Sequence, residues 1–369
     1  MNANEPTMRI IYDGAIYQEE NAGGIKRYFA NLIRRLPADF EPHVTICRGP
    51  SVTDPSHQFL RTHRFRRFRP QRFSVRLEKV FFGRVQDSHS FSLAHPTYYT
   101  LLSQREIADY LCPTVITVWD MIHELFPALD PSGSVAQQKR RAVEAADAVL
   151  CISENTKRDL LARHRVDEKK VLVTHLGTDL DATLVQGDER TPSRPYFLYV
   201  GARAGYKNFD GLLSAFAQAA TLVSDIALCA VGSQFSREEA RRIVELGLTG
   251  RVEAYSKVSD RQLAALYGHS IALVYPSLYE GFGIPPLEAM HCGTPVVASN
   301  RASIPEVVGN AGILFDPDSA NELTDILVSL ARDPASREAL IQRGYERARR
   351  FSWDETARQT IEVYRNLTR

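Results

Sequence analysis

Residues Glu280-Gly-Phe-Gly-Ile-Pro-Pro-Leu-Glu288 join a predicted strand to a predicted helix through a glycine loop. The preceding run, Ile271-Ala-Leu-Val-Tyr275, is typical of a buried strand. Two consecutive prolines suit the first turn of a helix, where a missing N–H costs little. Gly293 is predicted to end this helix, and Thr294–Ala298 to form the next strand. This order of strand, helix and strand predicts a βαβ unit in an open α/β sheet.

The two carboxylates of this segment are predicted to lie at different places. Glu280 falls on the loop at the carboxyl end of a strand, and Glu288 falls in the first turn of the next helix. In open α/β sheets, ligands bind in the crevice outside the carboxyl ends of the strands. Both carboxylates are therefore candidates for contact with a ligand.

The size and composition of the chain limit its class. Its 369 residues are too many for one ordinary core and predict two domains. A net charge of +1 gives no global field that would favour nucleic acid.

The five cysteines are scattered, which favours reduced structural thiols. The N-terminus lacks the pattern of a secretory signal, and no apolar run is long enough to span a membrane. We therefore expect a cytoplasmic protein that needs no nucleic-acid partner.

Strand-like and helix-like segments alternate along the whole chain. In the first half, Gly23-Gly24 leads into an amphipathic helix, and the polar, proline-bearing segment 181–195 is a predicted linker. Ser352-Trp-Asp-Glu355 is a capping-box pattern that opens a last helix. The predicted class is α/β, with two Rossmann-like doubly wound domains facing each other across a cleft. The expected ranges are 1–185, 186–350 and a terminal helix at 351–369, and the expected strands are 9–12, 44–47, 114–118, 148–152, 171–174, 196–200, 226–231, 252–255, 271–275 and 296–298.

A second segment of the second half is suited to an anion. The predicted strand Tyr196–Val200 runs into Gly201-Ala-Arg203-Ala-Gly205-Tyr-Lys207-Asn208, before a helix. A helix N-terminus and two cations favour a diphosphate there. A sugar nucleotide also needs a carboxylate at its ribose diol and close backbone approach at its sugar. Glu288 and the loop Gly281-Phe282-Gly283 could supply these.

The motif Glu-Gly-Phe-Gly-Ile-Pro-Pro-Leu-Glu-Ala-Met-x-Cys-Gly-Thr-Pro-Val-Val-Ala-Ser, at residues 280–299, resembles the signature of the retaining glycosyltransferases of family 4, which have the GT-B fold. The resemblance also includes Gly23-Gly24, Arg203 with Lys207, and the segment 303–318. It is highly specific over residues 196–318 and looser over residues 1–180, where the acceptor would bind. It implies that the last helix crosses back onto the N-terminal domain.

The resemblance also implies roles for single residues. Arg203 and Lys207 would neutralise the leaving nucleoside diphosphate in place of a metal, so no metal or other cofactor is expected. Glu280 would contact the donor sugar and Glu288 the ribose, at opposite ends of one donor. The base would lie near Tyr255–Val258. The donor-binding set is Gly23, Gly24, Arg203, Lys207, Val258, Gly281, Phe282, Gly283, Ile284 and Glu288.

The sequence departs from this pattern after the predicted strand Thr114–Val118. Many relatives have a His-Asp pair there, and this chain has Trp119-Asp120. Asp120 keeps the second half of the pair, and His123 either replaces the missing imidazole or is a surface or capping residue. The catalytic candidates are therefore Glu280, Asp120 and His123. Trp119 either packs in the interior or forms an aromatic floor for a sugar.

Two further segments contain residues that could contact a ligand. Asp316-Pro-Asp318 has the form of a metal-binding Asp-x-Asp motif, but it precedes a predicted helix, so Asp318 or Ser319 is expected to cap that helix. Candidate acceptor contacts are His95, Tyr98, Tyr99 and Trp119.

The segment Arg61–Phe82 is strongly basic, with seven arginines, one lysine and five interleaved phenylalanines. It is either a patch that docks on an anionic membrane, at the inner face, or a solvated loop whose phenylalanines pack on the domain.

The expected function is transfer of a hexose from a sugar nucleotide to a glycan or a polyprenyl-diphosphate-linked acceptor in surface polysaccharide biosynthesis. GDP-mannose is the preferred donor, with UDP-glucose and UDP-N-acetylglucosamine as rivals. The other classes considered are a non-catalytic sugar-nucleotide binding protein and an epimerase or phosphorylase of the same fold. The sequence does not specify the acceptor, the linkage or the oligomeric state.

Overall fold

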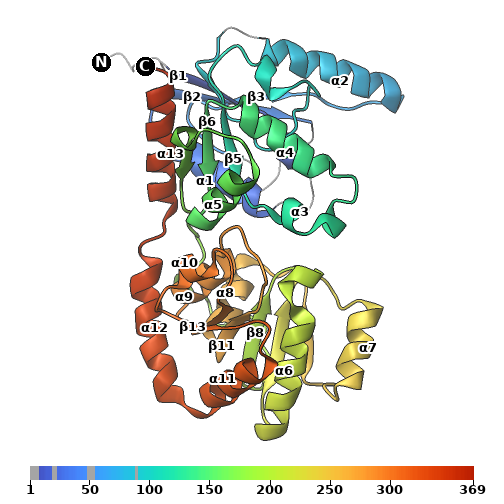
Figure 1. Ribbon diagram of the computed structural model, residues 1–369, viewed down its shortest axis with the longest axis vertical. Coiled ribbons are helices and arrows are strands. Elements are labelled where there is room, and N and C mark those ends of the chain that lie inside the picture. The colour runs from blue at the N-terminus through green and yellow to red at the C-terminus, as the bar shows by residue number, and fades with distance from the viewer. Residues whose placement is uncertain (1–7, 19–22, 48–54, 88–89) are drawn as a thin grey trace. The chain divides into compact units, whose positions relative to one another are not determined.

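A computed structural model describes residues 8–18, 23–47, 55–87 and 90–369 (Figure 1). The chain divides into two compact units. The N-terminal unit comprises Met1–Leu176 together with Trp353–Arg369, and the C-terminal unit comprises Gly177–Ser352.

The N-terminal unit is built on parallel strands. A four-stranded sheet has the order β3-β2-β1-β4, and a three-stranded sheet has the order β5-β6-β7. A parallel bridge between Ala94 and Thr114 links the two sheets. The strands are β1 (Met8–Tyr12), β2 (Phe40–Ile46), β3 (Arg61–Arg64), β4 (Leu93–Ala94), β5 (Val115–Val118), β6 (Ala148–Cys151) and β7 (Val171–Val173).

The helices of this unit include some that were not predicted from the sequence. They are α1 (Gly23–Arg34), α2 (Gln71–Gln86), α3 (Ile122–Leu125), α4 (Ser134–Ala145), α5 (Glu154–Arg163) and α13 (Trp353–Leu367). Strand β3 and helix α2 replace the solvated loop considered for Arg61–Phe82. The inward face of α2 includes Ser74, Glu78, Phe82 and Gln86, which recur every four residues. Three of these four side chains are polar, and the apolar residues at helical spacing, Phe73, Leu77 and Val80, lie on the exposed face instead.

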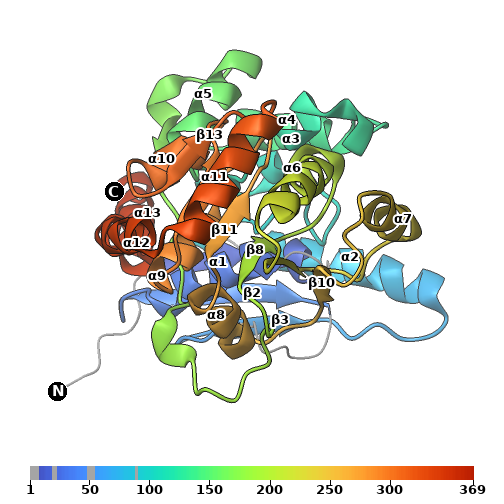
Figure 2. The same cartoon turned by 90° about the horizontal axis from the view of Figure 1, so that it is seen from below.

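The C-terminal unit has one six-stranded parallel sheet with the order β10-β9-β8-β11-β12-β13. Its strands are β8 (Tyr196–Val200), β9 (Ala227–Val231), β10 (Val252–Tyr255), β11 (Ala272–Tyr275), β12 (Val296–Ser299) and β13 (Ile313–Phe315). Its helices are α6 (Phe209–Leu222), α7 (Arg237–Glu245), α8 (Asp260–Gly268), α9 (Ile284–His291), α10 (Ile304–Val308), α11 (Ala320–Arg332) and α12 (Pro334–Ala348). Helices α6 and α11 lie on one side of the sheet and α8 and α9 on the other (Figure 2). Both units are therefore Rossmann-like, as predicted, and β13 is an additional strand.

The strand order places one switch point in each unit. In the C-terminal unit, β8 is flanked by β9 and β11, so successive connections leave it in opposite directions. In the N-terminal unit, β1 has the same position between β2 and β4. Loops that follow such central strands diverge and leave a crevice where ligands bind. A ligand site is therefore expected on the loops after β8 and β11 or on the loops after β1 and β4.

Helix α13 is an integral part of the N-terminal unit. The Tyr364 hydroxyl lies 3.3 Å from that of Tyr12 and 2.5 Å from Nδ1 of His95. The Trp353 ring packs against Tyr28, which also contacts Trp119. Tyr364 is fully buried among these rings. The helix thus contributes an aromatic and hydrogen-bonded layer to the core of this unit.

We predict that Tyr364→Ala destabilises the N-terminal unit by about 3–5 kcal/mol, because it removes a buried ring and leaves a cavity. The chain's two tryptophans, Trp119 and Trp353, both lie in this unit, so their fluorescence during urea denaturation reports its unfolding. The matched control is Glu362→Ala on the exposed face of the same helix, for which we expect a change within about 0.5 kcal/mol. Equal effects of the two variants would contradict the anchoring role of Tyr364.

Candidate functional site

An ion pair connects the two loops at the switch point of the C-terminal unit. Lys207 Nζ lies 2.7 Å from Glu280 Oε1 and 2.8 Å from Oε2. The Glu280 side chain is 9% exposed and that of Lys207 15%. The Leu278 amide donates to the carbonyl of Tyr206 at 2.8 Å, which joins the same loops through the backbone. The structure therefore brings together a cation that follows β8 and a carboxylate that follows β11.

Hydrogen bonds to its backbone hold the glycine loop after Glu280 in place. The buried Ser303 hydroxyl lies 2.8 Å from the carbonyl oxygen of Glu280 and 2.6 Å from that of Phe282. Gly283 has φ +128°, a region that side chains disfavour, so this glycine is required by the backbone itself. Burial and the neighbouring Glu280 carboxylate raise the pKa of Tyr275, so its hydroxyl keeps its proton. These contacts fix the loop before any ligand binds.

Glu288 lies on α9 and is held by a residue that the sequence analysis missed. The fully buried Tyr267, on α8, donates its hydroxyl to Glu288 Oε2 at 3.0 Å. Burial and the neighbouring carboxylate raise the pKa of Tyr267, so its hydroxyl keeps its proton and remains a donor. The Glu288 residue is itself 6% exposed. A tyrosine in an apolar helix carries no sequence signal for this role.

Arg203 does not share a partner with Lys207. Its Nε lies 2.6 Å from Glu239 Oε1, and its Nη2 donates to the carbonyls of Ser233 and Gln234 at 2.8 and 2.9 Å. The guanidinium carbon lies 5.0 Å from the ring centre of Phe235. Only Nη1 is without a hydrogen-bond partner among the described residues. Arg203 and Lys207 were predicted to bind one diphosphate. In the structure, two different carboxylates hold them.

Glu239 is a second residue that the sequence analysis missed. It occupies the third position of α7 and closes a capping box with Ser236. The pattern Ser236-x-x-Glu239 could have indicated this cap, but not the contact with Arg203. A cavity of about 610 Å³ between α6 and α7 is lined by Arg203 and Glu239. Lys207, Glu280 and Glu288 are not among its lining residues.

The other donor-binding candidates of the C-terminal unit lie on its loops and at the start of α9. Ile284 begins α9 and is half-buried, and Phe282 is buried against Phe351 at 5.7 Å between ring centres. Val258 is half-buried on the loop after β10. Gly281 is buried on the loop itself.

Gly23 and Gly24 are exposed and belong to the first turn of α1 rather than to a loop before it. A Cβ added at Gly23 would meet no atom of the described residues within 4 Å. Packing among these residues therefore gives no reason for this glycine.

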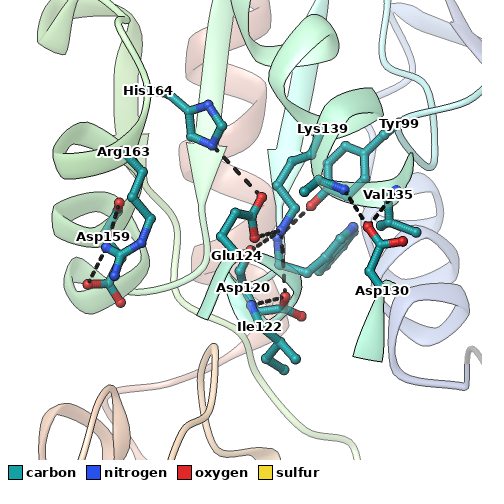
Figure 3. A network of polar contacts seen from close by, with 12 residues as sticks. Tyr99, Asp120, Ile122, Glu124, Asp130, Val135, Lys139, Asp159, Arg163 and His164 are labelled. Carbon is teal, nitrogen blue, oxygen red and sulfur yellow. Dashed lines mark hydrogen bonds and ion pairs between the residues drawn. The ribbon is translucent and has the colours of Figure 1, made fainter. Parts of the chain in front are cut away.

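In the N-terminal unit, Asp120 lies beside a buried lysine (Figure 3). The Lys139 ammonium lies 2.8 Å from the Asp120 carbonyl oxygen, 2.8 Å from Glu124 Oε2 and 3.8 Å from Asp120 Oδ1. Its side chain is 1% exposed. Burial alone would raise the pKa of Glu124, but the His164 ring, 3.8 Å away, and the charge of Lys139 lower it to about 2. This buried cation fixes the segment that carries Asp120.

His123 and Trp119 flank that segment. His123 lies on α3 and is half-buried, and its Nδ1 has no hydrogen-bond partner among the described residues. The Asp120 carboxylate accepts from the amide of Ile122 at 3.0 Å, at the start of this helix. Trp119 is buried, and its ring packs at right angles to that of Tyr28, 5.0 Å away between ring centres. Trp119 therefore packs in the interior.

The other acceptor candidates differ in accessibility. His95 is fully buried, and its two ring nitrogens face Tyr364 and Thr117 at 2.5 and 2.9 Å. Burial lowers the pKa of His95 to about 3, so the ring is neutral and acts in packing. This position corrects its assignment as an acceptor contact, because it leaves no ring atom for a sugar. Tyr99 is buried, and the Lys139 ammonium lies over its ring. Tyr98 is half-buried.

Asp13 is a third residue whose position and contacts were not predicted from the sequence. It follows β1 directly, at the switch point of the N-terminal unit. Its carboxylate accepts from the Leu102 amide at 3.0 and 3.2 Å. Burial raises the pKa of Asp13 to about 7, against the effect of these hydrogen bonds.

Asp316 and Asp318 both pair with Arg301, at 2.8 and 2.9 Å, and Ser319 caps α11. No group of three or more metal-ligating side chains occurs in residues 8–18, 23–47, 55–87 and 90–369. Over the same ranges, no helix has the length and apolar character needed to cross a membrane.

Comparison with known proteins identifies the family. Residues 22–182 match the model described as Glycosyltransferase Family 4, and residues 185–347 match that described as Glycosyl transferases group 1. The chain is 32% identical to the MMP alpha-(1->4)-mannosyltransferase of Mycolicibacterium hassiacum, over 80% of this chain and 74% of that protein. The chain therefore belongs to the family-4 glycosyltransferases, as its motifs predicted.

Further comparisons extend over nearly the whole chain. It is 27% identical to the O-antigen chain mannosyltransferase B of Escherichia coli, over 93% of this chain and 96% of that protein. Among solved structures, sucrose-phosphate synthase from Thermosynechococcus elongatus aligns with a TM-score of 0.70 at 23% identity, covering 98% of this chain and 99% of that one. HepE from Anabaena, in complex with UDP and glucose, aligns with a TM-score of 0.71 at 19% identity, covering 98% and 100%. These likenesses confirm the GT-B fold.

We predict that Lys207→Met destabilises the C-terminal unit by about 3 kcal/mol, because it leaves the carboxylate of Glu280 buried and unpaired. The double variant Lys207→Met/Glu280→Gln should recover most of that loss, since neither charge then remains. Calorimetric unfolding is the measurement, because both tryptophans lie in the other unit.

The control for this cycle is Arg301→Met, which breaks an exposed pair in the same unit and should cost at most about 1 kcal/mol. Additive effects of the Lys207 and Glu280 substitutions would show that the pair contributes no coupling.

Proposed function

We propose that this glycosyltransferase transfers a mannosyl group from GDP-mannose, with retention at the anomeric carbon. The acceptor is proposed to be a glycan or a polyprenyl-diphosphate-linked oligosaccharide in surface polysaccharide biosynthesis. Two relatives already described are named mannosyltransferases, and one of these names refers to an O-antigen chain. A third, the O-antigen chain mannosyltransferase RfbU of Salmonella typhimurium, is 28% identical over 58% of this chain and 60% of that protein.

The observation that carries this proposal is the Lys207–Glu280 pair at the switch point, with Glu288 on the helix that follows. The pair lies where the loops after β8 and β11 meet, which is the position of the ligand crevice in such sheets. Glu288, positioned by Tyr267, would accept hydrogen bonds from the ribose hydroxyls. Glu280, on the glycine loop, would contact the hexose. One donor would thus extend from one carboxylate to the other.

The chemistry requires stabilisation of a departing anion. The bond between the anomeric carbon and the diphosphate oxygen breaks, the acceptor hydroxyl oxygen forms the new bond to that carbon, and the hydroxyl proton passes to the departing diphosphate oxygen. Negative charge develops on the nucleoside diphosphate, and a fixed cation such as Lys207 stabilises it. Arg203 would add a second cation through Nη1, or through the whole guanidinium if the diphosphate replaced Glu239. We propose that these side chains act without a divalent metal.

A UDP-sugar is the alternative donor. HepE from Anabaena was solved with UDP and glucose, and its fold covers this chain almost completely. The loop after β10, with Val258, is where the base of either nucleotide would lie. Release of nucleoside diphosphate from GDP-mannose, UDP-glucose and UDP-N-acetylglucosamine, with and without EDTA, distinguishes the donors. Donor binding without release for any acceptor would favour a non-catalytic sugar-nucleotide binding protein.

We predict that Glu280→Gln and Glu288→Gln affect different kinetic constants. Glu280→Gln should lower kcat by about a hundredfold with little change in KM, because its contact with the hexose matters most in the transition state. Glu288→Gln should raise KM for the donor about tenfold, because it weakens a ground-state contact with the ribose. Both constants are measured by nucleoside diphosphate release at saturating acceptor.

The control for these variants is Glu338→Gln, an exposed glutamate on α12, which should behave as wild type. Reversed effects on kcat and KM would mean that the two ends of the donor are assigned the wrong way round. Equal effects of all three variants would contradict the proposed site.

A further inference from the structure

Helix α2 exposes an apolar stripe on its outward face. Phe73, Leu77 and Val80 recur at a spacing of four and three residues, which places them on one side of a helix. Their exposed fractions are 65%, 51% and 46%, and Phe68, just before the helix, is 47% exposed. Large apolar side chains that gather in this way on a surface mark an interaction site. Figure 1 shows α2 at the periphery of the N-terminal unit.

The opposite face of α2 is anchored, so the stripe cannot turn inward. Phe82 is buried against Cys47 and Leu102. The Gln86 side chain accepts from the Ser103 hydroxyl at 2.8 Å and donates to the Glu106 carbonyl at 3.2 Å. These contacts fix the rotation of the helix about its axis. The exposure of Phe73 and Leu77 is therefore built into the fold.

The charges of α2 and of the segment before it are mainly positive. Glu78 is the only acidic residue between Arg61 and Gln86, and it is buried. Arg67 holds it with two hydrogen bonds, of 2.6 and 2.9 Å. The exposed arginines of this segment are Arg61, Arg66, Arg67, Arg69, Arg72, Arg76 and Arg84. Asp87, which ends α2, is an exposed carboxylate and pairs with Arg105. This surface therefore combines an apolar stripe with an excess of positive charge.

We propose that α2 and the preceding segment Phe68–Pro70 form a docking surface for an anionic lipid bilayer. A helix with an apolar stripe and cationic flanks lies in the plane of the interface, with its apolar side chains among the acyl chains and its cations against the headgroups. Arginine suits this position because its aliphatic stem contacts apolar atoms while its guanidinium remains at the headgroups. The inference rests on this surface alone and does not depend on the donor proposed above.

The experiment is flotation of the full chain with vesicles of phosphatidylcholine, alone or mixed with phosphatidylglycerol, at low and high NaCl. Wild type should float only with the anionic vesicles, and less at high salt because charge attraction is screened. Phe73→Ala/Leu77→Ala and Arg72→Gln/Arg76→Gln should each lower the bound fraction at least about tenfold, since apolar burial and charge both contribute. All four positions are exposed, so both variants should keep the wild-type melting temperature.

The matched controls remove the same residue types from exposed positions of the C-terminal unit. Leu222→Ala/Val244→Ala and Arg343→Gln/Arg349→Gln should float as wild type does. Equal flotation with neutral and anionic vesicles, or no flotation, would overturn the proposal. A concentration-dependent dimer that Phe73→Ala/Leu77→Ala abolishes would also overturn it, because the stripe would then serve a second copy of the chain. Donor binding measured on the same samples tests the proposed function separately.

Discussion

The ion pair between Lys207 and Glu280 is the interaction on which the candidate site depends. It joins the loops after β8 and β11, at the point where the sheet of the C-terminal unit changes winding direction. A lysine and a glutamate so little exposed are stable only as a pair, since loss of either partner leaves a buried charge. Ser303 holds the carboxylate side, and the backbone bond from Leu278 to Tyr206 holds the two loops together. The site is thus organised before a donor arrives.

The second cation shows that charge alone does not define a binding site. Arg203 lies on the same loop as Lys207, yet Glu239 and two backbone carbonyls hold its guanidinium. A diphosphate that binds either cation must therefore compete with the carboxylate that already holds it, Glu239 for Arg203 and Glu280 for Lys207. In the N-terminal unit, Lys139 is buried beneath Asp120 in a similar way, and there its role is to fix a loop.

The sequence predicted the elements that follow a strong local rule. Alternating apolar runs located the central strands, and the prolines and glycines around Glu280 located the loop and α9. The family motif predicted Lys207, Glu280 and Glu288 for one donor, and the structure brings Lys207 and Glu280 together. Tyr267, Glu239 and Asp13 were missed because their roles arise from contacts between distant segments. Helix α2 was missed because its buried face is largely polar, and the apolar residues that recur at helical spacing are interleaved with arginines, which favoured a solvated loop or a surface patch. His95 was assigned to an acceptor because sequence does not distinguish a buried histidine from an accessible one.

A structure of the chain with GDP bound tests the central claim most directly. We predict that the diphosphate lies within hydrogen-bond distance of Lys207 Nζ and that the ribose hydroxyls donate to Glu288, with Tyr267 still in contact. The Lys207–Glu280 distance should lengthen, because the ammonium then has a second anionic partner. A nucleotide found instead in the cavity between α6 and α7, with the Lys207–Glu280 pair unchanged at 2.7 Å, would contradict the account.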